Sequence, residues 1–526
     1  MVSWREAGRR GLIAIVGLAA VALATAAAPP KADWARHDQA RTQALRRILA
    51  APAFQQGFFG VYVYSLDRRR VLFNHDGDHY FTPASNAKLF TLATALRLLG
   101  PDFRFHTAAV AAAPPDASGL VTGDVAWIGV GDPSLSGRPY PYRPDPRAPA
   151  LPYDPELVPQ RLAAAIAARG VRRITGNIVG DDSYFPDAPY PSGWAISDEV
   201  WDYGAPVAAL TLNDNTRFLQ VFPGVGVGDA ARLVFTPALD PPAMLNGAVT
   251  VAAGGRTQLR LGADPLTGGL RLQGGIAVGS PGVLEALAVR QPALYAAELL
   301  RQALIERGVV VDGVARARHL APAAGAAPES YELAGRDSPP LAEILQATAK
   351  VSQNLEAELM LRVLGKLRTA PAPAAARGGG RGAPEPGTSA AGEAVVRAFL
   401  QDAGLGARDD ALVDGSGLSR TDLVTPAGVV RLLTYMAQRP EGAVWRALLP
   451  VAGRDGTLEH RFTGTGVAGR LSAKTGSLSH VNSLSGYLTA RDGERLVFSL
   501  LSNNVNRPAP AVRQQLDRLA EAIAEQ

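Results

Sequence analysis

Apolar residues that alternate or cluster over short stretches predict strands near both ends of the chain. Residues 60–64 and 71–73 are rich in Val, Tyr, Leu and Phe on either side of a polar turn, which predicts a β-hairpin. Residues 483–488 and 495–500 have the same character and flank the turn former Arg491-Asp492-Gly493. We therefore expect a second hairpin close to the C-terminus.

Helical patterns occupy much of the remainder. Residues 89–96 are apolar nearly all round, which predicts a helix buried in the middle of a domain. Further helical patterns lie at 292–307 and 341–365. The C-terminal helix has one apolar face, formed by Val512, Leu516, Leu519 and Ile523. Its other face mixes positive and negative charges, which favours packing against a sheet over anchoring at a membrane surface.

The pattern of predicted elements changes between residues 106 and 285. Short strand-like stretches such as 125–128 and 176–179 alternate there with turns. Residues 368–392 are a low-complexity stretch of Ala, Pro and Gly, which predicts a flexible loop.

The first segment has the pattern of an export signal. Arg5, Arg9 and Arg10 precede an apolar run at 11–23, which ends in the small residues 24–28. This order predicts a signal peptide over 1–26, cleaved after residue 26 or 27. The run is shorter than the roughly 20 residues that a membrane span needs, so cleavage is favoured over an uncleaved anchor. We expect an exported, periplasmic protein with no stable membrane anchor.

Composition excludes several classes of function. Of 526 residues, 47% are hydrophobic and 19% charged, which excludes wholesale disorder. The net charge of +5 is too weak for a dedicated nucleic-acid binder. The chain has no cysteine, which excludes disulfides, thiol catalysis and cysteine-ligated metals. The pattern His75-Asp76-Gly77-Asp78-His79 looks metal-like but is better explained as a solvated turn. We expect neither metal nor cofactor.

Three short motifs carry candidate chemistry. Ser85 and Lys88 stand three residues apart at the start of the buried helix, so the hydroxyl and the amine share a face. A desolvated lysine can lose its proton near neutral pH and activate a serine. Ser352-Gln353-Asn354 precedes a helical stretch, and Lys474-Thr475-Gly476 is followed by Ser477 in sequence that suits an edge strand lining a cleft. The glycine there would let a substrate backbone approach closely.

The three motifs, in this order, form the set found in penicillin-binding proteins and serine β-lactamases. The chain resembles the class C low-molecular-mass penicillin-binding proteins, the D-alanyl-D-alanine carboxypeptidase/endopeptidase family. Gln353 departs from the aspartate often found there, but Ser352 and Asn354 are the chemically required members. Further segments resemble the family at 83–88, 131–135, 414–420, 456–458 and 473–477.

The resemblance implies an α/β (α+β) fold of the penicillin-binding, serine β-lactamase-like transpeptidase type. An antiparallel sheet with terminal helices would pack against a helical lobe that carries Ser85 and Ser352. The long gap between these serines implies inserted β-rich α+β domains, which we place at 106–285. The peptidase domain would then comprise 27–105 and 286–526, with the 368–392 loop inside it.

The resemblance also implies roles for the site residues. Ser85 would be the acylated nucleophile and Lys88 its base, while Ser352 and Lys474 would relay a proton to the leaving amine. Asn354 would hold either the substrate's carbonyl or the Lys88 ammonium. Thr475 and Arg420 would bind the terminal carboxylate of the substrate, and Gly476 would allow its backbone to approach closely. The N–H groups of Ser85 and Ser477 would stabilise the oxyanion. Asp181 would contact the amino group of a diaminopimelate side chain.

The implied function is cleavage of peptidoglycan stem peptides at D-alanine, at chain ends or at diaminopimelate crosslinks, with β-lactams as inhibitors. Two rivals remain: a β-lactamase, which needs fast deacylation, and a catalytically silent wall-binding scaffold. The intact motif set argues against the silent protein. A homodimer is left open.

Overall fold

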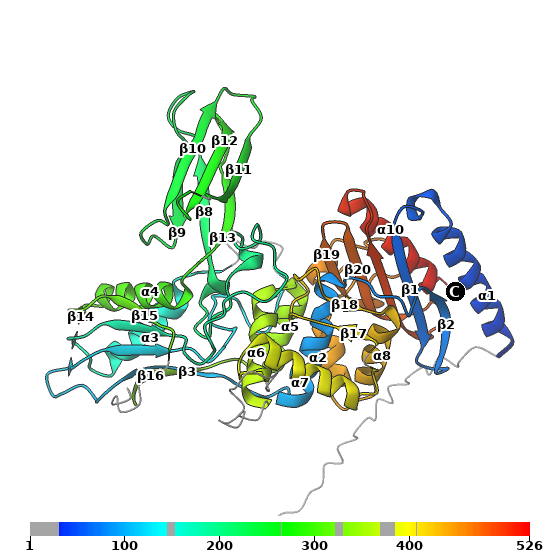
Figure 1. Ribbon diagram of the computed structural model, residues 1–526, viewed down its shortest axis with the longest axis horizontal. Helices are drawn as coiled ribbons and strands as arrows, with labels where there is room; N and C mark the ends of the chain where they lie inside the picture. The colour runs from blue at the N-terminus through cyan, green and yellow to red at the C-terminus, as the bar shows by residue number, and fades with distance from the viewer. Residues whose placement is uncertain are drawn as a thin grey trace, which may run out of the picture.

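The computed structural model describes residues 31–144, 153–264, 266–320, 330–368, 384–406 and 408–525. A body with a central sheet continues into an inserted α/β unit, from which a lobe of β-strands projects (Figure 1). The predicted signal peptide and positions 369–383 of the predicted loop lie outside the described residues. Within the described ranges, no helix has the length and apolar character needed to cross a bilayer.

Strands from the two ends of the chain build the central sheet. Its order is β19-β20-β21-β1-β2, all antiparallel, and the two predicted hairpins are confirmed as β1–β2 and β20–β21. The strands are β1 (Phe58–Ser65), β2 (Arg70–His75), β19 (Leu471–Leu478), β20 (Val481–Thr489) and β21 (Arg495–Asn503). The pairing of β1 with β21 joins the hairpins, and β19 lies at an edge, as the third motif predicted.

The terminal helices α1 (Lys31–Leu49) and α10 (Ala509–Ala524) cover one face of the sheet (Figure 1). The predicted apolar face of α10 is buried there against β-strand residues such as Val61 and Phe498. Packing of the last helix on the sheet is thus confirmed.

A helical lobe covers the other face. It comprises α2 (Lys88–Leu99), α5 (Leu341–Val351), α6 (Asn354–Arg368), α7 (Ser389–Asp402), α8 (Pro426–Ala437) and α9 (Gly442–Leu448). Residues 88–96 of α2 are all buried, as predicted. The helical pattern at 341–365 forms two helices, because Ser352 adopts left-handed angles that a right-handed helix cannot continue. Residues 389–392, predicted as loop, are helical because the Thr388 hydroxyl caps α7.

Short elements connect these parts. They are the 3₁₀ turns Pro52–Phe54, η2 (Ala84–Ala87), Asp202–Gly204, Asn213–Asn215 and Gly456–Leu458, and the two-stranded sheet of β17 (Asp410–Ala411) and β18 (Leu423–Val424).

The inserted unit extends beyond the predicted boundary. Its main sheet has the order β15-β7-β5-β3-β16, and a small sheet has the order β14-β6-β4. The elements are β3 (His106–Ala111), β4 (Leu120–Val121), β5 (Val125–Ile128), α3 (Leu157–Ala168), β6 (Arg173–Ile174), β7 (Ile178–Asp181), α4 (Pro292–Glu306), β14 (Val310–Val311), β15 (Ala315–Arg318) and β16 (Tyr331–Asp337). We had expected the insertion to end at residue 285. The unit instead runs to Asp337, because β15 and β16 pair with β7 and β3.

The projecting lobe is a pair of three-stranded sheets. One has the order β13-β8-β9 and the other β10-β12-β11, with Leu219, Ala248 and Leu272 buried between them. The strands are β8 (Thr216–Phe222), β9 (Arg232–Thr236), β10 (Met244–Val251), β11 (Gln258–Ala263), β12 (Leu270–Ala277) and β13 (Val283–Ala288).

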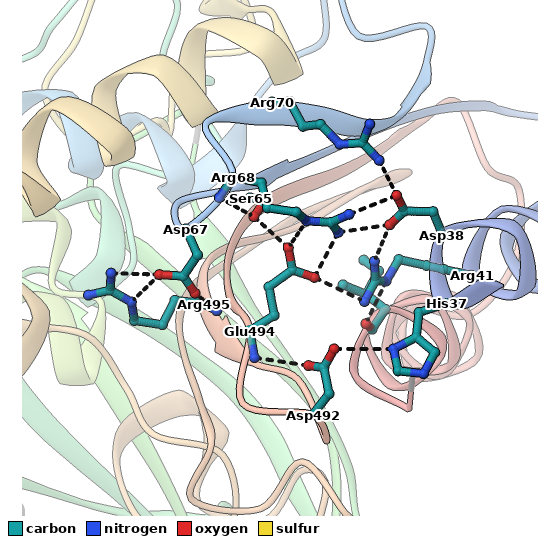
Figure 2. A network of polar contacts seen from close by, with 11 residues as sticks. His37, Asp38, Arg41, Ser65, Asp67, Arg68, Arg70, Asp492, Glu494 and Arg495 are labelled. Carbon is teal, nitrogen blue, oxygen red and sulfur yellow. Dashed lines mark hydrogen bonds and ion pairs between the residues drawn. The ribbon is translucent and has the colours of Figure 1, made fainter. Parts of the chain in front are cut away.

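A network of charged side chains fastens α1 to the central sheet (Figure 2). The Arg68 guanidinium donates to Glu494 at 2.5 and 2.9 Å and to both oxygens of Asp38 at 2.8 Å. Arg41 lies 3.6 Å from Glu494, and its Nε donates to the carbonyl of Ile523 at 3.1 Å. Because Asp38 and Arg41 belong to α1, these pairs tie the first helix to two strand turns and to α10.

Glu494→Ala should lower the free energy of unfolding by about 3–5 kcal/mol, because it leaves Arg41 and Arg68 buried without their shared carboxylate. Chemical denaturation of the purified protein measures this. The control is Asp67→Ala, which removes a more exposed ion pair with Arg495 and should cost at most about 1 kcal/mol. Equal losses in the two variants would contradict a special role for the buried network.

Candidate active site

Lys88 lies at the centre of the candidate site with its amine fully buried. Its Nζ donates to Ser85 Oγ at 3.0 Å, to Asn354 Oδ1 at 2.6 Å and to the carbonyl of Ser416 at 2.7 Å. Burial lowers the pKa of Lys88 to about 8, although nearby carboxylates, led by Asp414, oppose that shift. An amine with this pKa is partly unprotonated near neutral pH, so it can accept the proton of Ser85.

A second amine–hydroxyl pair joins the other two motifs. Lys474 Nζ donates to Ser352 Oγ at 2.7 Å and to the carbonyl of Thr475 at 2.9 Å. Burial, followed by repulsion from Lys88, holds the pKa of Lys474 well below its ordinary value. The predicted partnership of Ser352 and Lys474 therefore exists as a direct hydrogen bond.

Unusual backbone angles set both serines in place. Ala84, just before Ser85, has φ 48°, and Ser352 has φ 62° and ψ 37°. Residues other than glycine adopt this left-handed region at a cost of about 1–3 kcal/mol, and such residues cluster at functional sites. The angles of Ser352 end α5 and allow α6 to begin two residues later, with the hydroxyl on Lys474.

One cavity of about 350 Å³ brings five of the predicted site residues together. Ser85, Ser352, Asn354, Arg420 and Ser477 all line it. The other lining residues are Asp198, Tyr203, Gly417, Leu418, Leu478 and Ser479. The cavity thus lies between the helical lobe, the edge strand β19 and a segment of the inserted unit.

The predicted carboxylate-binding residues lie at the β19 side of the site. Arg420 donates to the carbonyl of Ser479 at 3.2 Å while it lines the cavity. The Thr475 hydroxyl donates to the hydroxyl of Thr457 at 2.7 Å, which links the third motif to the 456–458 turn. Thr475 is not among the residues that line the cavity.

Gly476 is closely packed against other segments of this chain. A Cβ atom at this position would lie 2.8 Å from the backbone nitrogen of Ser85 and 2.3 Å from Ser483 Oγ. The glycine therefore lets β19 approach the turn that carries Ser85. Close approach of a substrate backbone at Gly476 stays a prediction.

Asp181 is not brought into the cavity. It is buried at the end of β7, where its carboxylate accepts from Arg318 at 3.1 Å. The carboxylate that lines the cavity is Asp198, next to Tyr203, and the carbonyl of Tyr203 accepts from the Asn354 amide at 2.8 Å. Sequence analysis missed both residues, because no motif or spacing relates them to Ser85. The Asn354 contacts match the expectation that it holds Lys88.

The segment 414–420 is ordered by one carboxylate. Asp414 accepts from the backbone of Ser416, Gly417 and Ser419 at 2.6–3.1 Å and from the Trp194 indole at 2.9 Å. These bonds hold the Ser416 carbonyl against Lys88. Gly417 has φ 79°, in the left-handed region that favours glycine, and at Gly415 an added Cβ atom would lie 2.8 Å from the carbonyl oxygen of Ala357.

The sequence profile of the D-Ala-D-Ala carboxypeptidase 3 (S13) family matches residues 41–523. The chain belongs to this family. It is 33% identical to the D-alanyl-D-alanine carboxypeptidase of Actinomadura sp. (strain R39), over 99% of this chain and 92% of that protein. It is 25% identical to D-alanyl-D-alanine carboxypeptidase DacB of Haemophilus influenzae, over 82% of this chain and 83% of the relative.

The fold comparison agrees with the family. The crystal structure of penicillin binding protein 4 from Haemophilus influenzae superimposes with a TM-score of 0.75 at 22% identity, over 91% of this chain and 97% of that one. The predicted fold class is therefore confirmed, and membership of the S13 family makes the chain a serine peptidase.

Gly476→Ala should lower D-alanine release from a D-Ala-D-Ala peptide by about 100-fold, because displacing Ser85 by about 1 Å misaligns the nucleophile. The matched control is Gly262→Ala on β11, where an added methyl group meets nothing within 4 Å. That variant should keep full activity and an unchanged melting temperature. Full activity of Gly476→Ala would contradict the packing assigned to β19.

Proposed function

We propose that this chain removes the terminal D-alanine from peptidoglycan stem peptides through an acyl-enzyme on Ser85. The observation that carries the proposal is the 3.0 Å contact between Ser85 Oγ and the buried Lys88 amine, in a cavity that also holds Ser352. A solvated lysine would be protonated and unable to act as a base at neutral pH.

Acylation begins when Lys88 takes the proton of Ser85 and Oγ attacks the carbonyl carbon of the penultimate residue. The N–H groups of Ser85 and Ser477 stabilise the negative oxygen of the tetrahedral intermediate. As the C–N bond breaks, the proton passes from Lys88 to the leaving nitrogen through Ser352 and Lys474. Water then hydrolyses the ester and restores the Ser85 hydroxyl.

Arg420 and Thr475 bind the terminal carboxylate in this scheme. Arg420 supports the assignment because it is a cation on the wall of the cavity that contains Ser85. A guanidinium forms strong, charge-assisted hydrogen bonds with carboxylates.

The same steps cut a D-alanyl–diaminopimelate crosslink when the leaving amine belongs to a neighbouring stem. They also open a β-lactam ring, which mimics the D-Ala-D-Ala terminus. The Haemophilus influenzae relative has been solved with a β-lactam bound. The arginine-rich and apolar pattern of residues 1–26 supports export to the periplasm, where this substrate lies.

Benzylpenicillin should add one acyl group per chain, on the peptide that contains Ser85. The protein should then turn over nitrocefin slowly but release D-alanine from pentapeptides over many cycles. Mass spectrometry and D-alanine assays measure both, with Ser85→Ala as the inactive control. Fast nitrocefin turnover with inert muropeptides would favour the β-lactamase, and no reaction with either would favour the silent scaffold.

The rate of acylation by benzylpenicillin should rise from about pH 6, reach half its maximum near pH 8 and level off above about pH 9. Lys88 must be unprotonated to accept the Ser85 proton, and its pKa of about 8 means that this form increases with pH. Stopped-flow or gel-based labelling at a series of pH values measures the profile. Lys88→Met should react on the order of 10²–10⁴ times more slowly. A flat wild-type profile would exclude Lys88 as the base.

We assign binding of the diaminopimelate amino group to Asp198 instead of Asp181. Asp198 lines the Ser85 cavity, whereas Asp181 is engaged by Arg318 away from it. Asp198→Asn should raise KM by about tenfold for peptides with a free side-chain amine and leave KM for their acetylated analogues unchanged. Asp181→Asn is the matched control and should change neither value. A raised KM in Asp181→Asn, with no change in Asp198→Asn, would instead support the role expected for Asp181.

A further inference from the structure

A second cavity, larger than the one that contains Ser85, lies outside the peptidase site. It has a volume of about 650 Å³, against about 350 Å³ for the cavity that contains Ser85, and the two share no lining residue. Its walls come from α3, from β3, β5 and β16 of the inserted sheet, and from the loop at 135–140. In Figure 1 these elements belong to the arm of the molecule farthest from β1 and β2.

The walls of this cavity are mostly apolar. Trp127 and Leu135 are each about 1% exposed, and Val158 and Leu162 of α3 pack beside them. Cavities of 300–1,000 Å³ with apolar walls and a few convergent polar groups are typical of sites for small organic molecules.

The charged groups on the walls are all cationic. Three arginines line the cavity, and none of the lining residues within the described part of the chain is acidic. Arg336 donates to Asp132 at 3.0 Å, and Arg138 donates to Asp214 at 3.0 Å, so carboxylates behind the wall balance these two charges. Arg161 lies on the exposed side of α3 at the cavity and has no hydrogen-bond or ion-pair partner within the described residues, so its guanidinium is available to an anionic ligand.

A hydroxyl inside the cavity also lacks a partner. Thr107 on β3 is about 1% exposed, and its Oγ1 makes no hydrogen bond within the described residues. A buried polar atom without a partner costs free energy, and such atoms in folded proteins call for an explanation. A bound molecule with an acceptor oxygen would provide the missing hydrogen bond.

We propose that this cavity binds an organic anion that combines a carboxylate or similar acid group with an apolar ring or chain. The acid group would pair with Arg161 and the apolar part would lie against Trp127, Leu135 and Leu162. Two further cavities of comparable size differ from it: the cavity of about 390 Å³ at β9 and α4 is lined by Glu199, Asp240 and Glu298, and the cavity of about 350 Å³ is the peptidase site.

The test uses 8-anilinonaphthalene-1-sulfonate as an anionic aromatic probe and N-phenyl-1-naphthylamine as its neutral counterpart. Titration by calorimetry should show one sulfonate probe bound per chain and at least about tenfold weaker binding of the neutral one. The affinity should be unchanged after acylation with benzylpenicillin, because the probe does not occupy the peptidase site.

Two variants locate the probe. Ala165 is an exposed residue of α3 that lines the cavity, and the indole of Ala165→Trp should fill the cavity and abolish binding. Arg161→Gln should weaken binding of the sulfonate about tenfold, with little change for the neutral probe. Arg290→Gln, at another cavity, is the control and should bind like the wild type. D-alanine release and melting temperature confirm that each variant is folded.

Three results would overturn the proposal. They are unchanged binding in Ala165→Trp, equal affinity for the two probes, and no saturable binding by the wild type. Loss of binding on acylation would also count against it, because it would place the probe in the peptidase cavity. None of these outcomes bears on the function assigned to Ser85.

Discussion

The burial of the Lys88 amine is the constraint on which the active site depends. An unpaired charge in the interior costs several kcal/mol, so a buried lysine must either be surrounded by acceptors or be neutral. Lys88 meets both conditions in part: three oxygens from three segments accept its hydrogens, and its pKa falls to about 8. The three hydrogen bonds of the Lys88 amine also fix the relative positions of Ser85, Asn354 and Ser416.

The central sheet brings these segments together. Pairing of β1 with β21 places the beginning and the end of the chain side by side, and β19 follows at the edge through β20. Gly476 then lets that edge approach the backbone of Ser85. Close packing between the two segments sets the distance between Ser85 and the third motif, so the geometry of the candidate site is a consequence of strand pairing in the body.

The inserted unit contributes directly to the same site. Trp194 donates to Asp414, whose carboxylate orders the loop that ends on Lys88, and the Tyr203 carbonyl accepts from Asn354. Asp198, which stands between Trp194 and Tyr203 in the chain, lines the same cavity as Ser85. The insertion therefore contacts the groups that surround Lys88: it supplies the Trp194 donor to Asp414 and the Tyr203 acceptor for Asn354.

The sequence alone determined the three motifs, the family, the strands at the chain ends and the buried helix, because these depend on local patterns and on short spacings such as that between Ser85 and Lys88. It placed the end of the insertion too early, because the partners of β15 and β16 lie more than a hundred residues away. It also assigned Asp181 to the site, although a distant arginine occupies that carboxylate. Only the tertiary structure could place Asp198 and Tyr203 beside Ser85, because contacts between remote segments arise from packing and leave no periodic trace in the chain.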